Sequence, residues 1–200
     1  MRRLISRPAL LLWALCLVLQ AGCGLFEPRD PEAPSQGGLN YRPPTAPEIV
    51  IANLQSAIDQ KSSANYINCF TDPSKTGRLF EFIPAVEASA VYPGIFDSWS
   101  RTEEEAYFQN LIAKSIPNSL SSLLLKLNTS VVTPDSVLFD YDYTLTFEHT
   151  DPSFPMTAKG RLQFSLATDN SNFWSIHRWQ DFKSATDEAT WSLFKGKFSN

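Results

Sequence analysis

Few side chains in this chain of 200 residues could do chemistry, and they form no familiar catalytic pattern. The sequence has two histidines and three cysteines. It has no His-x-x-His, Cys-x-x-Cys or Gly-x-Ser-x-Gly motif and no glycine-rich phosphate loop, which are the usual marks of zinc sites, hydrolases and nucleotide sites. We therefore expect no metal site, no cofactor and no catalytic constellation.

His177 is the more promising of the two histidines, because it shares a predicted strand with Asp181 and two tryptophans. An imidazole close to a carboxylate can accept or donate a proton near neutral pH. Strand alternation nevertheless places His177 on the face opposite to Trp174 and Ile176, which favours a side chain that points away from the core. His149 falls at the end of another predicted strand, and we interpret it as a solvated surface histidine.

Several aromatic residues carry a polar tip on an apolar body, which suits the lining of a small-molecule pocket. Together with His177, the pocket candidates are Tyr66, Trp99, Tyr141 and Tyr143. The alternative is that these rings simply fill the core. The sequence does not decide between the two interpretations.

The N-terminus is typical of a secretory signal, with a basic start, a short apolar run over residues 9–18 and small residues before a cut. The run is shorter than the roughly 20 residues that span a bilayer. Ala21-Gly22-Cys23 resembles a bacterial lipobox, whose cysteine is lipidated, although Gln20 stands where such motifs usually place a leucine or another small or apolar residue. We predict a signal peptide over 1–22 and lipidation of Cys23; the alternative is a secreted protein with a free thiol there.

The mature chain divides into a tether and one domain. Prolines, Gly37-Gly38 and charged residues make up 23–45, a composition that cannot build a core. Residues 46–200 are predicted to form a single domain. Cys69 is then the one remaining thiol besides Cys23, so we expect no disulfide framework, and we interpret Cys69 as a small buried apolar residue.

The charge balance limits the partners of this chain. Acidic residues outnumber basic ones, 21 to 17, and removal of the arginine-rich signal widens the difference. An excess of acid argues against a nucleic-acid partner and against a polybasic grip on anionic lipid. The predicted lipid would therefore have to hold the protein to its membrane, for which several acyl chains suffice.

A long hairpin over residues 137–167 is the centre of the predicted domain. Apolar residues recur at every second position in both arms, so one face of the hairpin is buried. On the other face, Asp140 and Asp142 in the first arm lie across or diagonal to Lys159 and Arg161 in the second. The hairpin is the floor of a half-covered antiparallel sheet.

Helices and further strands surround this hairpin in the prediction. Helices begin near Thr45, at Ser62 or Ser63 and at Thr102, and a last helix runs from Thr186 until Gly196 ends it. The Thr102-Glu103-Glu104-Glu105 stretch is interpreted as a capping box and not as a metal site. The other strands are predicted at 79–84, at a sheet edge, at 120–132 and at 173–179. The fold class is α+β, with N-terminal helices on a curved, mostly antiparallel sheet.

The order of these elements, with the loose motifs at Ala57 through Asp72 and Trp174 through Asp181, resembles the nuclear transport factor two-like superfamily, which includes steroid isomerases. The resemblance implies helices that close one face of a curved sheet around a pocket. In the isomerase pattern a tyrosine and an aspartate carry the chemistry. Leu54 and Ile83 stand at those positions here, and neither can move a proton.

The sequence therefore favours a lipid-anchored, non-enzymatic binding domain of the bacterial cell envelope, on the outer membrane where there are two membranes. Its partner would be a protein or an apolar small molecule. The alternative is an isomerase- or hydratase-like enzyme that uses Tyr66, Asp72 or His177 as an unfamiliar acid or base. A homodimer formed through the open sheet face is a third expectation.

Overall fold

The centre of the domain is a five-stranded sheet, in the order β1-β5-β4-β3-β2. The structure is a computed structural model that describes residues 41–184 and 187–199. The strands are β1 (Glu81–Ile83), β2 (Ser121–Val132), β3 (Ser136–Phe147), β4 (Thr157–Thr168) and β5 (Trp174–Phe182). The helices are α2 (Pro47–Asp59), α3 (Ser63–Ile67), α4 (Pro73–Thr76), α5 (Val86–Val91), α6 (Arg101–Ala113) and α7 (Trp191–Phe198).

The sheet is antiparallel except at one edge. Strands β2, β3, β4 and β5 pair antiparallel in succession, and β1 pairs parallel with β5. The short strand before Pro84 thus lies at an edge, as its proline predicts. The predicted fold class is confirmed: helices precede a mostly antiparallel sheet.

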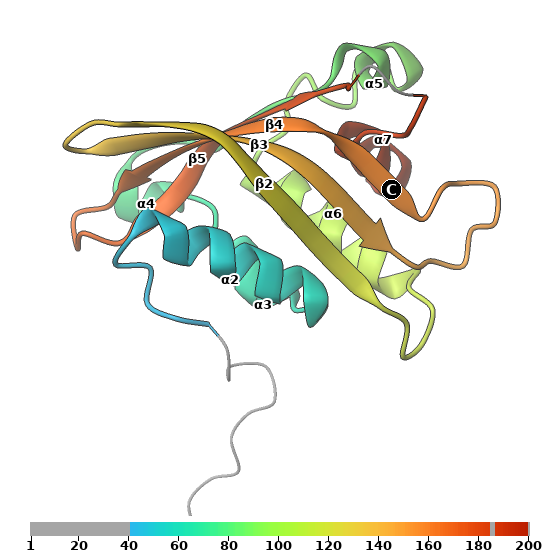
Figure 1. Ribbon diagram of the computed structural model, residues 1–200, viewed down its shortest axis with the longest axis horizontal. Helices are drawn as coiled ribbons and strands as arrows, with labels where there is room; N and C mark the ends of the chain where they lie inside the picture. Colours follow the sequence, from blue (N-terminus) through green and yellow to red (C-terminus); the bar gives the residue numbers. More distant parts are fainter. Residues whose placement is uncertain (1–40, 185–186, 200) are drawn as a thin grey trace, which may run out of the picture. The chain divides into compact units, whose positions relative to one another are not determined.

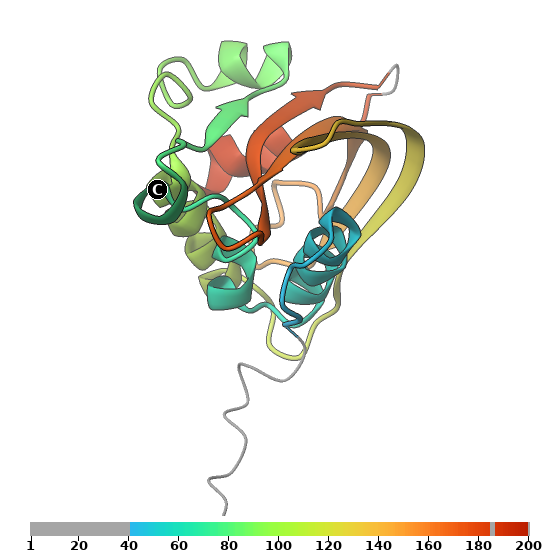
Figure 2. The ribbon, with the colours of Figure 1, turned by 90° about the vertical axis from the view of Figure 1, so that its left-hand side faces the viewer.

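The helices cover one face of this sheet (Figure 1). Helix α2 packs against β2, α3 packs between α2 and α6, and α7 packs against α6 and β4. Figure 2 shows the sheet curving around this helical layer. The apolar residues of β3 and β4 point to the helices and form one core with them; the largest members are Trp179, Trp191, Tyr66, Tyr107 and Phe70.

The predicted charge pairs lie on the opposite, outer face. Asp142 stands opposite Arg161 in the ladder, and Arg161 also forms a 2.6 Å ion pair with its diagonal neighbour Asp140. Gln163 donates a further hydrogen bond to Asp140. The alternation of charge along the hairpin therefore predicted the Asp140–Arg161 pair, whereas Lys159 stands opposite Thr144 and forms its ion pair with Glu188.

A β-bulge in β5 puts Trp179 on the same buried face of the sheet as Ile176. Ser165 pairs with Arg178 and Leu166 with Ile176, so His177 is the extra residue. Ile176 and Trp179 are consequently both fully buried, although they are three positions apart. Strict alternation would have sent Trp179 outward.

The predicted boundaries of two helices are wrong. Helix α6 begins at Arg101, and its capping box joins Ser100 to Glu103, not Thr102 to Glu105. Helix α7 begins after Thr190 and continues through Gly196, so this glycine lies inside the helix.

The first described residues run along the domain. Arg42 exchanges two backbone hydrogen bonds with the Asn53 side chain, and the Trp174 amide donates to the Pro44 carbonyl. The predicted tether 23–45 therefore ends in a segment that is bonded to the domain. The signal peptide, Cys23 and most of the tether lie outside the described residues, within which no helix is long and apolar enough to cross a bilayer.

Candidate functional site

Two of the pocket candidates meet in the interior at one carboxylate. The Tyr66 hydroxyl donates to Glu104 Oε1 at 2.5 Å, and the Trp99 indole N–H donates to Oε2 at 2.7 Å. Tyr66 and Glu104 are fully buried and Trp99 is 5% exposed. Burial raises the pKa of Tyr66 well above its usual value, and the neighbouring Glu104 adds to the rise.

Glu104 is paired with a cation that sequence analysis did not single out. The Lys195 ammonium, from α7, binds Glu104 Oε2, and both side chains are fully buried. The assignment of Glu104 to helix capping is therefore wrong. Its spacing held a signal: Glu104 shares a helical face with Tyr107, Phe108 and Leu111, at intervals of three, four and seven residues.

Aromatic rings enclose the Lys195 ammonium. Its Nζ lies 3.6 Å from the centroid of Trp179 and 3.9 Å from that of Phe82. Trp99 and Tyr107 follow at 5.6 Å each. Such rings attract a cation through their electron-rich faces. Burial nevertheless lowers the pKa of Lys195 to about 8, because it removes water from the charge, while Glu104 opposes that shift.

Asp181 forms a second polar cluster beside the first. Its carboxylate accepts bonds from the Tyr143 hydroxyl at 2.9 Å and from the backbone and side chain of Ser192 at 2.7 and 2.6 Å. Burial raises its pKa to about 6, while these bonds and Lys195 act in the opposite direction. The Tyr143 hydroxyl also accepts from the Trp191 amide, so it joins β3 to the start of α7.

Tyr141 is the fourth aromatic candidate and lies farther along β3. It is 8% exposed, and its ring centroid is 5.6 Å from that of Phe139. Burial raises its pKa to about 12. Tyr66, Trp99, Tyr141 and Tyr143 thus all belong to the core, where three of them satisfy carboxylates; their role in ligand binding stays a prediction.

The two histidines lie in different surroundings. His149 is fully buried among Phe154, Phe194 and Phe198, so its assignment to the surface is wrong. His177 is partly buried at a hollow of about 20 Å³, which suffices for a single water. Burial, with Arg78 and Arg178 nearby, lowers its pKa to about 4, so the ring is neutral at pH 7.

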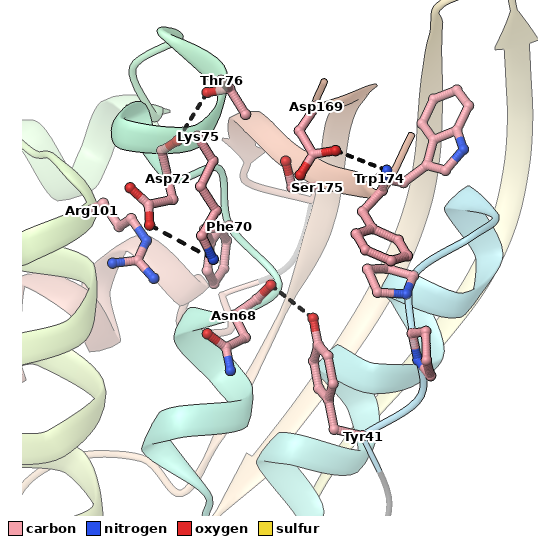
Figure 3. A pocket seen from close by; sticks show the side chains of 13 residues that line it. Tyr41, Asn68, Phe70, Asp72, Lys75, Thr76, Arg101, Asp169, Trp174 and Ser175 are labelled. Carbon is pink, nitrogen blue, oxygen red and sulfur yellow. Dashed lines mark hydrogen bonds and ion pairs between the residues drawn. The ribbon is translucent and has the colours of Figure 1, made fainter. Parts of the chain in front are cut away.

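A groove on the domain surface has room for a small molecule, with a volume of about 400 Å³ (Figure 3). Its walls come from the N-terminal segment, the turn after α3, helix α4, the start of α6 and the loop between β4 and β5. The lining residues are Tyr41, Pro43, Pro44, Asn68, Phe70, Asp72, Lys75, Thr76, Arg101, Asp169, Phe173, Trp174 and Ser175. None of the five pocket candidates is among them.

Hydrogen bonds fix the walls of this groove. The Tyr41 hydroxyl donates to the Asn68 carbonyl at 2.9 Å, which ties the N-terminal segment to the end of α3. The Trp174 amide donates to the Pro44 carbonyl at 2.8 Å, which ties that segment to β5. Phe173 is 41% exposed beside it. The groove therefore has an aromatic and proline-rich side that is held in place.

Hydrogen bonds engage one oxygen of each acid in the groove, and Arg101 keeps spare donors. Asp72 caps α4 by accepting from the Ser74 amide and hydroxyl, and these bonds, followed by Arg101 and Lys75, lower its pKa. Asp169 accepts from two amides of its own loop. Arg101, by contrast, donates from one nitrogen to the Ile67 carbonyl, and its buried Nε has no hydrogen-bond partner among the described residues.

The candidates for acid–base chemistry lie in different places. Tyr66 is in the closed interior, Asp72 is in the groove and His177 is at the small hollow. Leu54, at the position of the isomerase tyrosine, is fully buried.

Within residues 41–184 and 187–199, no group of three His, Cys, Asp or Glu side chains could hold a metal ion. Cys69 is buried with a free thiol, as predicted.

Comparison with protein-family models gives no match, and comparison with curated proteins gives none either. Solved structures do show similarity. A candidate aromatic ring hydroxylase from Novosphingobium aromaticivorans has a TM-score of 0.50 at 13% identity, over 72% of this chain and 90% of that chain. A conserved protein from Planctomyces limnophilus has a TM-score of 0.50 at 11% identity, over 68% and 91%.

A third similar structure carries the superfamily name. The nuclear transport factor 2-like superfamily protein from Salmonella enterica has a TM-score of 0.49 at 15% identity, over 69% of this chain and 88% of that chain. At such identities a likeness concerns the fold alone. The architecture described above, with helices on the inner face of a curved sheet, is the one that the resemblance to this superfamily implies.

Proposed function

We propose that this chain is a lipid-anchored protein of the bacterial cell envelope whose domain binds a partner protein or an apolar small molecule without catalysing a reaction. The observation that carries the proposal is the contrast between the filled interior and the open groove. Lys195 and Glu104 occupy the interior together with Tyr66, and all three are fully buried. The groove of about 400 Å³ is accessible and mostly lined by aromatic, proline and polar residues.

The arrangement of titratable groups supports a binding role over catalysis. A general base must reach the proton that it removes, directly or through one water. Asp181 has a raised pKa, which often marks a catalytic group, yet it is 2% exposed and already accepts three hydrogen bonds. Asp72 is accessible, but it is engaged in capping α4. An isomerase- or hydratase-like activity would require the interior to open.

Native mass spectrometry of the full chain, released gently from membranes, tests the proposal. We expect the wild-type chain to retain a small molecule or a partner protein. Phe173→Ala removes an exposed ring from the groove, and Phe182→Ala is a matched control because this phenylalanine contacts Arg161 on the outer face of the sheet. Retention should be lost in the first variant and kept in the second; equal retention by both would contradict binding in the groove.

Association through the outer sheet face is a further prediction about partners. That face carries the Asp140–Arg161 ion pair and is polar along β3 and β4. A second copy would have to match these charges. Light scattering of the full chain in nanodiscs, at several concentrations, distinguishes a monomer from a dimer, and substitution of Arg161 by Glu should weaken a dimer formed by this face.

A further inference from the structure

We propose that the groove binds a small amphiphilic anion: an aromatic or alkyl body that carries a carboxylate, sulfonate or phosphate next to Arg101. This inference rests on the proposed binding function and names the ligand class. It comes from the Arg101 guanidinium, most of whose hydrogen-bond donors have no partner among the described residues.

The formal charge of the lining is balanced, because Asp72 and Asp169 oppose Lys75 and Arg101. The four side chains differ in how many of their hydrogen-bonding groups have a partner. Each acid accepts two hydrogen bonds from its own turn on Oδ1, whereas the Arg101 guanidinium makes one hydrogen bond among the described residues, to a neutral carbonyl.

The basic residues retain donors for a ligand. Lys75 lies 4.0 Å from Asp72, with 69% of its side chain exposed, so this ion pair is loose. Arg101 lies within 4.0 Å of no carboxylate among the described residues, although its charge helps to lower the pKa of Asp72. Its one hydrogen bond among the described residues goes to the neutral carbonyl of Ile67 at 3.2 Å, and its buried Nε has no partner there. The other N–H groups of the guanidinium can donate to an anion in the groove, and such charge-assisted hydrogen bonds are stronger than neutral ones.

The rest of the groove suits the body of such a ligand. Phe70, Phe173 and Trp174 provide ring surface, and Pro43 and Pro44 extend the wall beside Trp174. The backbone of this wall is held by the bond between the Trp174 amide and the Pro44 carbonyl. A preformed apolar wall with a few charged groups beside it suits a small amphiphile. Figure 3 shows Arg101 and Trp174 on opposite sides of the groove.

The test uses three probes of equal shape and different charge: 2-naphthoate, 2-naphthamide and 2-naphthylmethylammonium. Each is titrated by calorimetry into the full chain in phosphatidylcholine nanodiscs, with empty nanodiscs as the blank. We expect 2-naphthoate to bind at least about tenfold more tightly than the other two, a difference of about 1.4 kcal/mol. Arg101→Gln should remove this preference, whereas the control Arg178→Gln, at an exposed ion pair with Glu81, should keep it.

The outcomes separate this inference from the proposed function. Equal or tighter binding of the neutral or cationic probe to the wild-type chain would overturn the anion preference, even if Arg101→Gln fails to fold. Absence of binding by all three probes would also overturn it, while a molecule or partner retained in native mass spectrometry would still support a binding domain. A preference for naphthoate that survives Arg101→Gln in a folded variant would overturn the role of Arg101.

Discussion

The Lys195 ammonium lies 3.6 Å from the centroid of the Trp179 ring, in the interior of the domain. One residue comes from the last helix and the other from the last strand, and Glu104 of α6 completes the contact. Removal of two charges from water costs several kcal/mol per ion, and their attraction repays this only with good geometry and further hydrogen bonds. Tyr66 and Trp99 supply those bonds on the Glu104 side.

Substitution of Lys195 by methionine should therefore destabilise the domain strongly. The variant keeps most of the volume but leaves the Glu104 carboxylate buried without its cation, which costs about 3–5 kcal/mol. Urea unfolding at pH 7 measures the change. Glu104→Gln added to Lys195→Met should restore part of the loss, and Lys197→Met, at a partly exposed pair with Asp151, should change stability by less than about 1 kcal/mol. A Lys195→Met variant as stable as the wild type would contradict the argument.

Asp181 should give the domain a distinctive pH dependence. Burial raises its pKa from 3.8 to about 6, so in this range the folded chain binds more protons than the unfolded chain. Its contribution to stability is fully present below pH 3.8 and is lost as the pH rises through 6, by about 2–3 kcal/mol. Asp181→Asn should lack this fall in the free energy of unfolding between pH 4 and 6. Asp142→Asn, at an exposed position, should keep it; equal profiles for both variants would argue against a protonated Asp181.

The comparison between sequence and structure shows which contacts a local pattern can predict. Alternation along two neighbouring strands was enough to place Asp140 diagonal to Arg161 of the next strand, because strand register is local. The pair of Lys195 with Glu104 spans 91 residues, and no spacing rule connects them. The helical periodicity of α6 could have shown that Glu104 faces the core, but not which cation it meets there.

The N-terminal segment should contribute to both stability and the groove. Asn53 is 2% exposed, and its amide group holds Arg42 through two bonds, at 3.0 and 2.7 Å. Asn53→Ala in the full chain should cost about 1–3 kcal/mol, because it leaves backbone groups unsatisfied. It should also speed hydrogen exchange at the amides of Arg42 and Trp174. Gln60→Ala, at an exposed position, is the control; unchanged exchange in Asn53→Ala would show that the segment is held in another way.

Gly196 lies inside α7 because Tyr92 occupies the space of a side chain. A Cβ at Gly196 would lie 2.2 Å from a ring atom of Tyr92. Gly196→Ala should therefore destabilise the domain by about 1–3 kcal/mol, although alanine favours a helix by about 1 kcal/mol. In a Tyr92→Ala background the same substitution should instead stabilise it. Thermal unfolding of the four chains forms a double-mutant cycle, and a coupling of zero would exclude this contact as the reason for the glycine.

Cys23 is the residue on which the proposed anchor depends. Its motif resembles a lipobox, and the residues that follow it, up to the bonded segment at Tyr41, are rich in proline and glycine. Cys23→Ser should leave the fold unchanged, because the described core contains no residue before Val50. The variant should keep its signal peptide, or be released in soluble form if another peptidase cuts it, because lipid processing requires the thiol.

Mass spectrometry of the mature wild-type N-terminus measures the modification directly, and we expect an acylated Cys23 in the membrane fraction. Gly24 is not an acidic residue of the kind that retains many lipoproteins in the inner membrane, so fractionation should place the protein in the outer membrane where two membranes exist. Cys69→Ser is the matched control, because this thiol is buried in the core and should not affect processing. An unmodified thiol at Cys23 in a soluble protein would remove the anchor and leave a free envelope domain.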